Sequence, residues 1–215
     1  KKKKIFFLLS ASLSGVSASP AMAQQGMTAP QSAAESDPVA ASPLSPLPNA
    51  SPRQTFSSFT RLTDDVEKSL LAAIERAAEN DAIFDTEEVT ALKKQALADL
   101  IKATSTLDLS SVAPASRRSV GISSVLLLKE ILDRLPEPDL AAIPGRAEVA
   151  AGKADHGWVL PGTEIRMVRV EGADGSPDYL FSEDTVRRLP AFYALVPDMP
   201  ERSGETMDFY HFFFF

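Results

Sequence analysis

Three stretches between Ser51 and Leu135 repeat apolar residues at helical spacing, and each stretch begins at a capping sequence. The first starts with Ser51-Pro52-Arg53-Gln54, which combines an N-cap serine, a proline at the first helical position and a capping-box glutamine. Its apolar positions are Phe56, Phe59, Leu62, Val66, Leu70 and Ile74. The pattern predicts a helix over residues 52–79, ended by Asn80 and Asp81.

Two further helices are predicted from the same kinds of signal. Asp85, with Glu88 three residues later, predicts the cap of a helix over residues 86–104. Pro114-Ala115-Ser116 opens a third helix, which Pro136 and Pro138 end. The apolar stripes are Val89, Leu92, Ala96, Leu97, Leu100 and Ile101 in the second helix, and Val120, Leu127, Leu128, Ile131 and Leu135 in the third. Residues 51–145 are therefore predicted to form a small bundle, onto which the connector Leu107-Asp108-Leu109 folds.

Residues 146–211 have a different character and predict a β-hairpin and a capped helix. Ala150–Gly157 is rich in turn formers and predicts a loop. Residues 164–170 have the β-branched bias of a strand. Residues 172–175 predict a turn, and residues 179–181 predict a short returning strand. Ser182 predicts the cap of a helix that Pro190 kinks or splits. The predicted fold class is mostly α, a three-helix bundle followed by a β-hairpin and a terminal helical element.

Two runs in this last part, Trp158–Ile165 and Leu180–Tyr193, combine turn formers, apolar anchors and a helix start. Pro161-Gly162 fits a type II turn, and the single tryptophan is large enough to anchor a core. We interpret ten residues of these runs as a structural motif rather than a site of chemistry: Trp158, Pro161, Gly162, Thr163, Glu164, Phe181, Ser182, Thr185, Phe192 and Tyr193.

The N-terminal part carries the features of an export signal. Four lysines, a short apolar run and the small-x-small sequence Ala21-Met22-Ala23 predict a signal peptide over residues 1–23. The apolar run is too short for a spanning helix, which makes a membrane anchor the weaker interpretation. Residues 24–50 are rich in Pro, Ala and Ser and predict a disordered linker. Its Asn49-Ala50-Ser51 sequon is interpreted as coincidental.

Charge and cysteine content narrow the classes of protein. Removal of Lys1–Lys4 would leave 18 basic against 29 acidic residues, a net charge of −11. This balance argues against a nucleic-acid partner. The sequence contains no cysteine, so disulfides, thiolate metal sites and a cysteine nucleophile are excluded. An exported domain without disulfides suits the bacterial periplasm.

Few residues suggest chemistry. Asp155-His156 is a candidate general base, although a histidine in a glycine-rich loop is usually a solvated residue. Glu183-Asp184 and Arg187-Arg188 are better explained by the helix dipole than by a carboxylate pair or an anion site. We therefore predict no catalytic residue, no cofactor-binding residue, no metal ligand and no small-molecule substrate.

The sequence ends on the aromatic run Phe209–Phe215, which a soluble monomer would rarely expose. One interpretation takes residues 212–215 as the aromatic stub of a chain truncated before a membrane part. The other takes the run as a tail buried against the bundle or a partner.

The motif order resembles one protein family. Trp158–Ile165 and Leu180–Tyr193 are similar to the module that precedes the membrane helices in a subset of bacterial small-conductance mechanosensitive channel (MscS-like) proteins. Ser51-Pro52-Arg53 with Phe56, the connector Leu107–Ser110 and the run Leu127–Leu135 occur in matching order, so the resemblance covers residues 51–211. The pore helix and vestibule of that family have no counterpart in the chain, and no pore or gating residue is carried over.

The resemblance implies a non-enzymatic periplasmic domain of a channel fragment without a pore. Its expected partners are other subunits, through the missing membrane part, and lipid headgroups, and its expected location is the periplasmic face of the inner membrane. Two alternatives stay open. One is a stand-alone periplasmic binding or adaptor protein, and the other is a hydrolase that uses His156.

Overall fold

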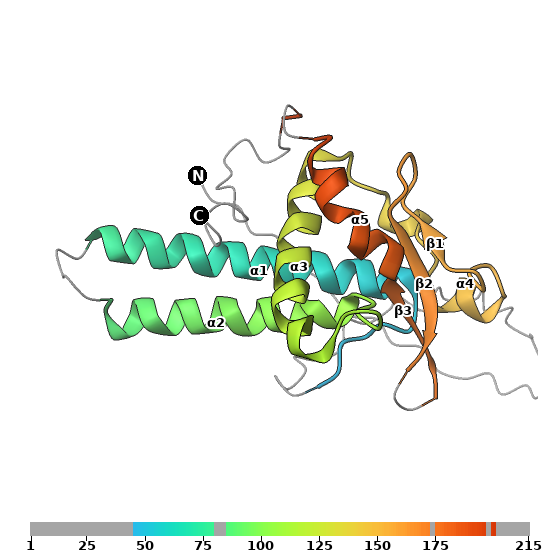
Figure 1. Ribbon diagram of the computed structural model, residues 1–215, viewed down its shortest axis with the longest axis horizontal. Helices are drawn as coiled ribbons and strands as arrows, with labels where there is room; N and C mark the ends of the chain where they lie inside the picture. The colour runs from blue at the N-terminus through green and yellow to red at the C-terminus, as the bar shows by residue number, and fades with distance from the viewer. Residues whose placement is uncertain (1–44, 80–84, 173–174, 197–198, 201–215) are drawn as a thin grey trace, which may run out of the picture. The chain divides into compact units, whose positions relative to one another are not determined.

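A computed structural model describes residues 45–79, 85–172, 175–196 and 199–200, all within one compact unit. The described part is mostly helical with one small antiparallel sheet, which confirms the predicted fold class (Figure 1). The elements are α1 (Pro52–Glu79), α2 (Glu87–Ala103), η1 (Thr104–Thr106), η2 (Pro114–Ser116), α3 (Arg117–Arg134), η3 (Leu140–Ala142), α4 (Arg146–Ala150), β1 (Trp158–Val159), β2 (Arg166–Glu171), β3 (Pro177–Phe181) and α5 (Glu183–Tyr193).

Helices α1 and α2 lie side by side as a helical hairpin (Figure 1). Ser51 Oγ accepts a hydrogen bond from the Gln54 amide at 3.3 Å, which confirms the predicted cap. The capping box is incomplete, because the Gln54 side-chain oxygen accepts from Arg146 Nε. The cap of α2 was predicted one residue too early, since Thr86 Oγ1 accepts from the Val89 amide at 3.2 Å. Asp85 instead pairs with Lys93.

Helix α3 crosses the hairpin and has α5 on its other side (Figure 1). Because it is covered from both sides, it buries residues around most of its circumference: Gly121, Ser124, Val125, Leu126, Leu127, Leu128, Glu130, Ile131 and Leu132. A Cβ at Gly121 would lie 3.0 Å from Thr104 and 3.1 Å from Leu109, so the absence of a side chain permits this close crossing.

Helix α5 is one continuous helix with Pro190 inside it, so of the two predicted effects the proline does not split the helix. Pro190 is exposed and lies in the last turns, where a missing amide removes one hydrogen bond without exposing buried backbone. The Ala194 amide still donates to the Pro190 carbonyl at 3.2 Å, which closes the helix end.

The sheet has the strand order β1-β2-β3 and is antiparallel throughout. The predicted hairpin is present as β2 and β3, with Arg169 opposite Tyr179. A third strand, β1, was not predicted, nor was the short helix α4, which ends where the predicted loop Ala150–Gly157 begins. The predicted docking of the connector is confirmed: Leu107 is buried and bridges Phe181, whose carbonyl accepts from the Asp108 amide at 2.8 Å.

One hydrophobic core joins the helical part to the sheet and α5. It extends from Phe56 to Val196 along the sequence, so the predicted segments 51–145 and 146–211 share their interior. Residues 45–50, assigned above to the disordered linker, are also part of the folded unit, and Leu47 packs against this core. Asn49 is 7% exposed, and its carbonyl accepts from the Tyr179 amide at 2.7 Å. The linker boundary at residue 50 was therefore placed too late.

Several predictions concern residues outside the described ranges. These are the signal peptide over 1–23, the linker up to residue 44, the helix stop at Asn80 and Asp81, and the aromatic run with its stub at 212–215. Within the described ranges, none of the helices combines the length and apolar character needed to cross a bilayer.

Candidate interaction site

The two sequence runs singled out above meet at the junction of the sheet and α5. Pro161 and Gly162 occupy the centre of a turn in which the Thr163 amide donates to the Leu160 carbonyl at 3.1 Å. Gly162 has a φ of +74°, as the third position of a type II turn requires. The Thr163 hydroxyl accepts from the Ile165 amide at 3.1 Å. The predicted turn is confirmed, and it directs the chain from β1 into β2.

The start of α5 is tied to the start of β2. Ser182 Oγ accepts from the Thr185 amide at 3.1 Å, which confirms the predicted cap. Thr185 Oγ1 accepts from the Arg166 amide at 2.9 Å, and the Arg166 carbonyl accepts from the Ser182 amide at 2.8 Å. Ser182 and Thr185 are both buried. These bonds fix the direction in which α5 leaves the sheet.

A charged surface covers this junction. Arg188 pairs with Glu164 and with Asp184, and its guanidinium lies 4.7 Å from the centre of the Phe192 ring. The hydrogen bond from Arg188 to Glu164 raises the pKa of the guanidinium, so it stays charged. The shallow depression beside it is lined by Val159, Thr163, Glu164, Arg166, Val168, Ser182, Asp184 and Arg188. Its two cations, Arg166 and Arg188, are balanced by the two carboxylates of Glu164 and Asp184.

The aromatic members of the motif contribute to packing. Phe181 is 1% exposed and meets Phe59 edge to face at 5.4 Å between ring centres. Trp158 is only partly buried; it lies across the edge of the core and meets Phe56 at 6.4 Å. Phe192 and Tyr193 are likewise partly buried against the core. The tryptophan therefore closes the core at its border instead of filling its centre.

The candidate pair Asp155-His156 lies in an exposed loop. Asp155 Oδ1 lies 3.7 Å from Arg169 Nη1, so its carboxylate is engaged by a cation on the neighbouring strand. In the described residues no group of three or more His, Cys, Asp or Glu side chains is placed to hold a metal ion.

A second cluster, which the sequence did not reveal, joins α1 to α3. Lys129 Nζ lies 2.7 Å from Asp133, 3.3 Å from Glu67 and 3.4 Å from Asp64. Burial alone would lower the pKa of Lys129, but the hydrogen bond to Asp133 and the charges of the three carboxylates together raise it. The signal in the sequence is the pair of charged residues Lys129 and Glu130 inside the apolar run Leu126–Leu132, although the partners of Lys129 on α1 cannot be read from that run.

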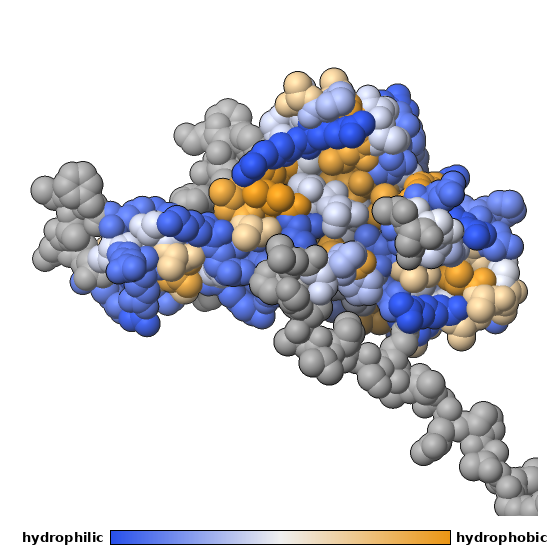
Figure 2. Space-filling model, turned by 90° about the horizontal axis from the view of Figure 1, so that it is seen from below, coloured by the Kyte–Doolittle hydropathy of each residue, from blue (hydrophilic) through white to orange (hydrophobic). Residues whose placement is uncertain are grey.

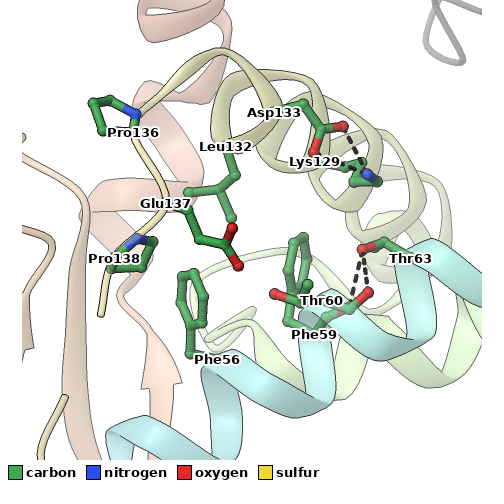
Figure 3. Close-up of a pocket in the computed structure, with 10 residues that line it drawn as sticks. All are labelled: Phe56, Phe59, Thr60, Thr63, Lys129, Leu132, Asp133, Pro136, Glu137 and Pro138. Atoms are coloured by element: carbon green, nitrogen blue, oxygen red, sulfur yellow. Dashed lines mark hydrogen bonds and ion pairs between the residues drawn. The ribbon is translucent and has the colours of Figure 1, made fainter. Parts of the chain in front are cut away.

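The cluster borders a small pocket between α1 and the end of α3 (Figure 3). Phe56, Phe59 and Leu132 form its apolar part, and the extended segment after α3 forms one wall. The full lining is Phe56, Phe59, Thr60, Thr63, Lys129, Leu132, Asp133, Pro136, Glu137 and Pro138. Figure 2 shows that the surface at the projecting end of the α1–α2 hairpin is largely hydrophilic. Apolar residues gather nearer the body of the molecule.

Comparison of the chain with known protein families, with characterised proteins and with solved structures gave no match.

Proposed function

We propose that the folded part of this chain is the non-enzymatic, periplasmic N-terminal module of an MscS-like mechanosensitive channel. In that role it contacts neighbouring subunits or lipid headgroups and modulates gating. The motif order described above motivates the proposal. The chain itself would conduct no ions, because the channel activity belongs to membrane helices that follow such a module.

The observation that carries the proposal is that the resembling segments meet in the fold: Phe56 of the first motif packs on Trp158 of the run Trp158–Ile165. Phe181, in the run Leu180–Tyr193, packs on Phe59 of α1 and accepts a hydrogen bond from the connector at Asp108. Arg53, in the first motif, donates to the Ile143 carbonyl at 2.9 Å and to the Ala141 carbonyl at 3.1 Å. Segments far apart in the sequence thus pack together in one module, as the proposal requires.

The coding sequence after Phe215 gives an inexpensive test. The proposal predicts a reading frame, direct or restored by a frameshift, that encodes consecutive apolar segments of about 20 residues. A stop codon followed by no such segments in any frame would contradict it.

The second candidate is a stand-alone periplasmic adaptor. The small pocket between α1 and α3 favours it, because a concave site lined by aromatic and charged side chains is suited to holding a partner. The two candidates differ in the downstream sequence, and an adaptor is also expected to be recovered with the soluble periplasmic fraction after osmotic shock.

A further inference from the structure

The end of α5 presents apolar side chains to solvent. Leu195 is 77% exposed, the highest value among the large apolar side chains of the described residues, and Met199 is 39% exposed. Phe192 and Tyr193 are only partly buried against the core. These four residues are called the α5 patch below. Apolar side chains gathered in this way indicate a contact surface, whereas singly scattered ones need no explanation.

The fold holds Leu195 in its exposed position. The next residue, Val196, is buried in the core. The amides of Leu195 and Val196 donate to the carbonyls of Phe192 and Tyr193 at 3.0 and 3.2 Å, and the Met199 amide donates to the Val196 carbonyl at 3.0 Å. Leu195 could turn inward only if Val196 left the core, so its exposure is a property of the folded chain.

The charge beside the α5 patch is positive. From Thr185 to Pro197 the sequence contains Arg187, Arg188 and no acidic residue, although acidic residues exceed basic ones by 29 to 22 in the whole chain. The guanidinium of Arg188 lies 4.7 Å from the centre of the Phe192 ring. The Arg187 side chain is 71% exposed, and its ion pair with Asp184 is exposed as well. Such a pair contributes little, so the guanidinium can exchange it for a phosphate.

A phospholipid surface matches both properties of the α5 patch. Its phosphates suit Arg187 and Arg188, its outer acyl region suits Leu195, and the layer between them favours the amphipathic ring of Tyr193. A two-fold contact with a second copy would instead bring the arginines of both copies together, and like charges that face each other are unfavourable. Further along the same sequence lies the aromatic run Phe209–Phe215, so a second apolar stretch follows the patch.

We propose that the α5 patch lies on a phospholipid bilayer. Leu195 and Met199 enter the boundary between headgroups and acyl chains, and Arg187 and Arg188 donate to lipid phosphates. The negative charge of the rest of the protein opposes this contact only weakly, because charges are screened beyond about 8 Å at physiological ionic strength. The inference rests on the proposed channel module, and it names the part of that module which meets the lipid.

Paramagnetic broadening of methyl signals tests this placement. The full chain, labelled at its leucine and methionine methyl groups, is mixed with nanodiscs of phosphatidylethanolamine and phosphatidylglycerol that carry a gadolinium chelate on a small fraction of headgroups. We expect the methyl signals of Leu195 and Met199 to lose intensity. Leu71 and Leu97 are matched controls, since they are 39% and 41% exposed on the α1–α2 hairpin. Broadening that is equal at the controls, or absent at Leu195, would overturn the proposal.

Two aspartate variants test the energetic role of the α5 patch. Leu195→Asp should lower the partition coefficient onto vesicles of the same lipids about tenfold, because an apolar side chain no longer enters the interface. Leu97→Asp adds the same charge at an exposed leucine outside the patch and should leave partitioning unchanged. Equal effects of the two variants would contradict the proposal, and near-UV circular dichroism checks that both are folded.

The arginines have a separate test. Arg187→Gln should weaken binding to the vesicles about fivefold, as expected for one basic residue at an anionic surface. Unchanged binding would contradict the contact between this residue and phosphate. Self-association without lipid that Leu195→Asp abolishes would assign the patch to a second copy and overturn the proposal.

The outcomes for the α5 patch and for the channel module are distinguishable. Vesicle binding that is insensitive to Leu195→Asp would remove the lipid contact and leave the channel proposal standing. A downstream sequence without apolar segments would remove the channel proposal, whereas the broadening at Leu195 and Met199 would still report a lipid contact.

Discussion

Gly157 has a backbone conformation and a neighbour that together require glycine. Its φ is +89°, and a Cβ there would overlap the carbonyl oxygen of Met167 on β2. Gly157→Ala is therefore expected to lower the free energy of unfolding by about 3 kcal/mol or more, through both strain and a clash with backbone. Chemical denaturation measures this loss.

Gly162 supplies the matched control. Its φ is +74°, but nothing lies within 4 Å of a Cβ built there. Gly162→Ala should cost only about 1 kcal/mol, which is the conformational penalty alone. Similar losses of unfolding free energy in the two variants would mean that the close approach of Gly157 to β2 does not contribute to the effect of the substitution.

The hydroxyl of Thr185 has a specific hydrogen-bonding role. Its buried hydroxyl is the acceptor for the Arg166 amide at 2.9 Å. Thr185→Val keeps the shape and leaves that amide without its acceptor, so we expect a loss of about 1–3 kcal/mol in unfolding free energy. Thr185→Ser retains the hydroxyl and should recover most of the loss. A valine variant as stable as the serine variant would refute this role.

Among the contacts between elements, that of α1 with α3 depends on pH. The folded-state pKa of Lys129 is raised above the ordinary value of 10.5, so its ion pairs stabilise the fold fully below that pH. The stabilisation is lost as the pH rises through the folded-state pKa. Lys129→Gln should cost about 2 kcal/mol near neutral pH.

The difference between the wild type and Lys129→Gln isolates this effect from other titrations. Unfolding free energies measured at increasing pH from pH 7 should draw closer together at the alkaline end. A difference that stays constant over the whole range would show that packing, rather than charge, accounts for the loss.

The elements also show what sequence patterns can and cannot predict. Helix α1 was predicted to its last described residue, because local signals, a cap and helical spacing, determine its extent. Strand β1 has two residues and no period of its own; it exists because β2 offers it hydrogen bonds. Leu97 fits the stripe of α2 and yet is 41% exposed. Periodicity locates a face, but the partner that covers it is decided by tertiary structure.

The candidate sites also divide into those set by local sequence and those set by tertiary structure. Pro161-Gly162 and Ser182 were recognised because turn and cap chemistry is local. The cluster around Lys129 was missed because its carboxylates come from two helices more than 60 residues apart, at Asp64 and Glu67 on α1 and at Asp133 on α3. Only the crossing of these helices brings the charges together.

At the scale of the whole molecule, the shared core predicts a single cooperative unfolding transition. Phe59 packs on Phe181, and Asn49 pairs with Tyr179, across the middle of the chain. A fragment of residues 45–145 loses these partners and should show neither a near-UV circular dichroism signal nor a cooperative denaturation. Residues 45–200 should show both. A cooperative transition in the shorter fragment would mean that the helical part folds independently.

Patch clamp tests most directly whether the proposed module modulates tension gating. The sequence would be expressed with its native downstream reading frame in cells that lack other mechanosensitive channels, with and without residues 51–196. The proposal predicts a tension-dependent current in both, with a different gating threshold after the deletion. The absence of any tension-dependent current, or identical thresholds in the two proteins, would contradict it.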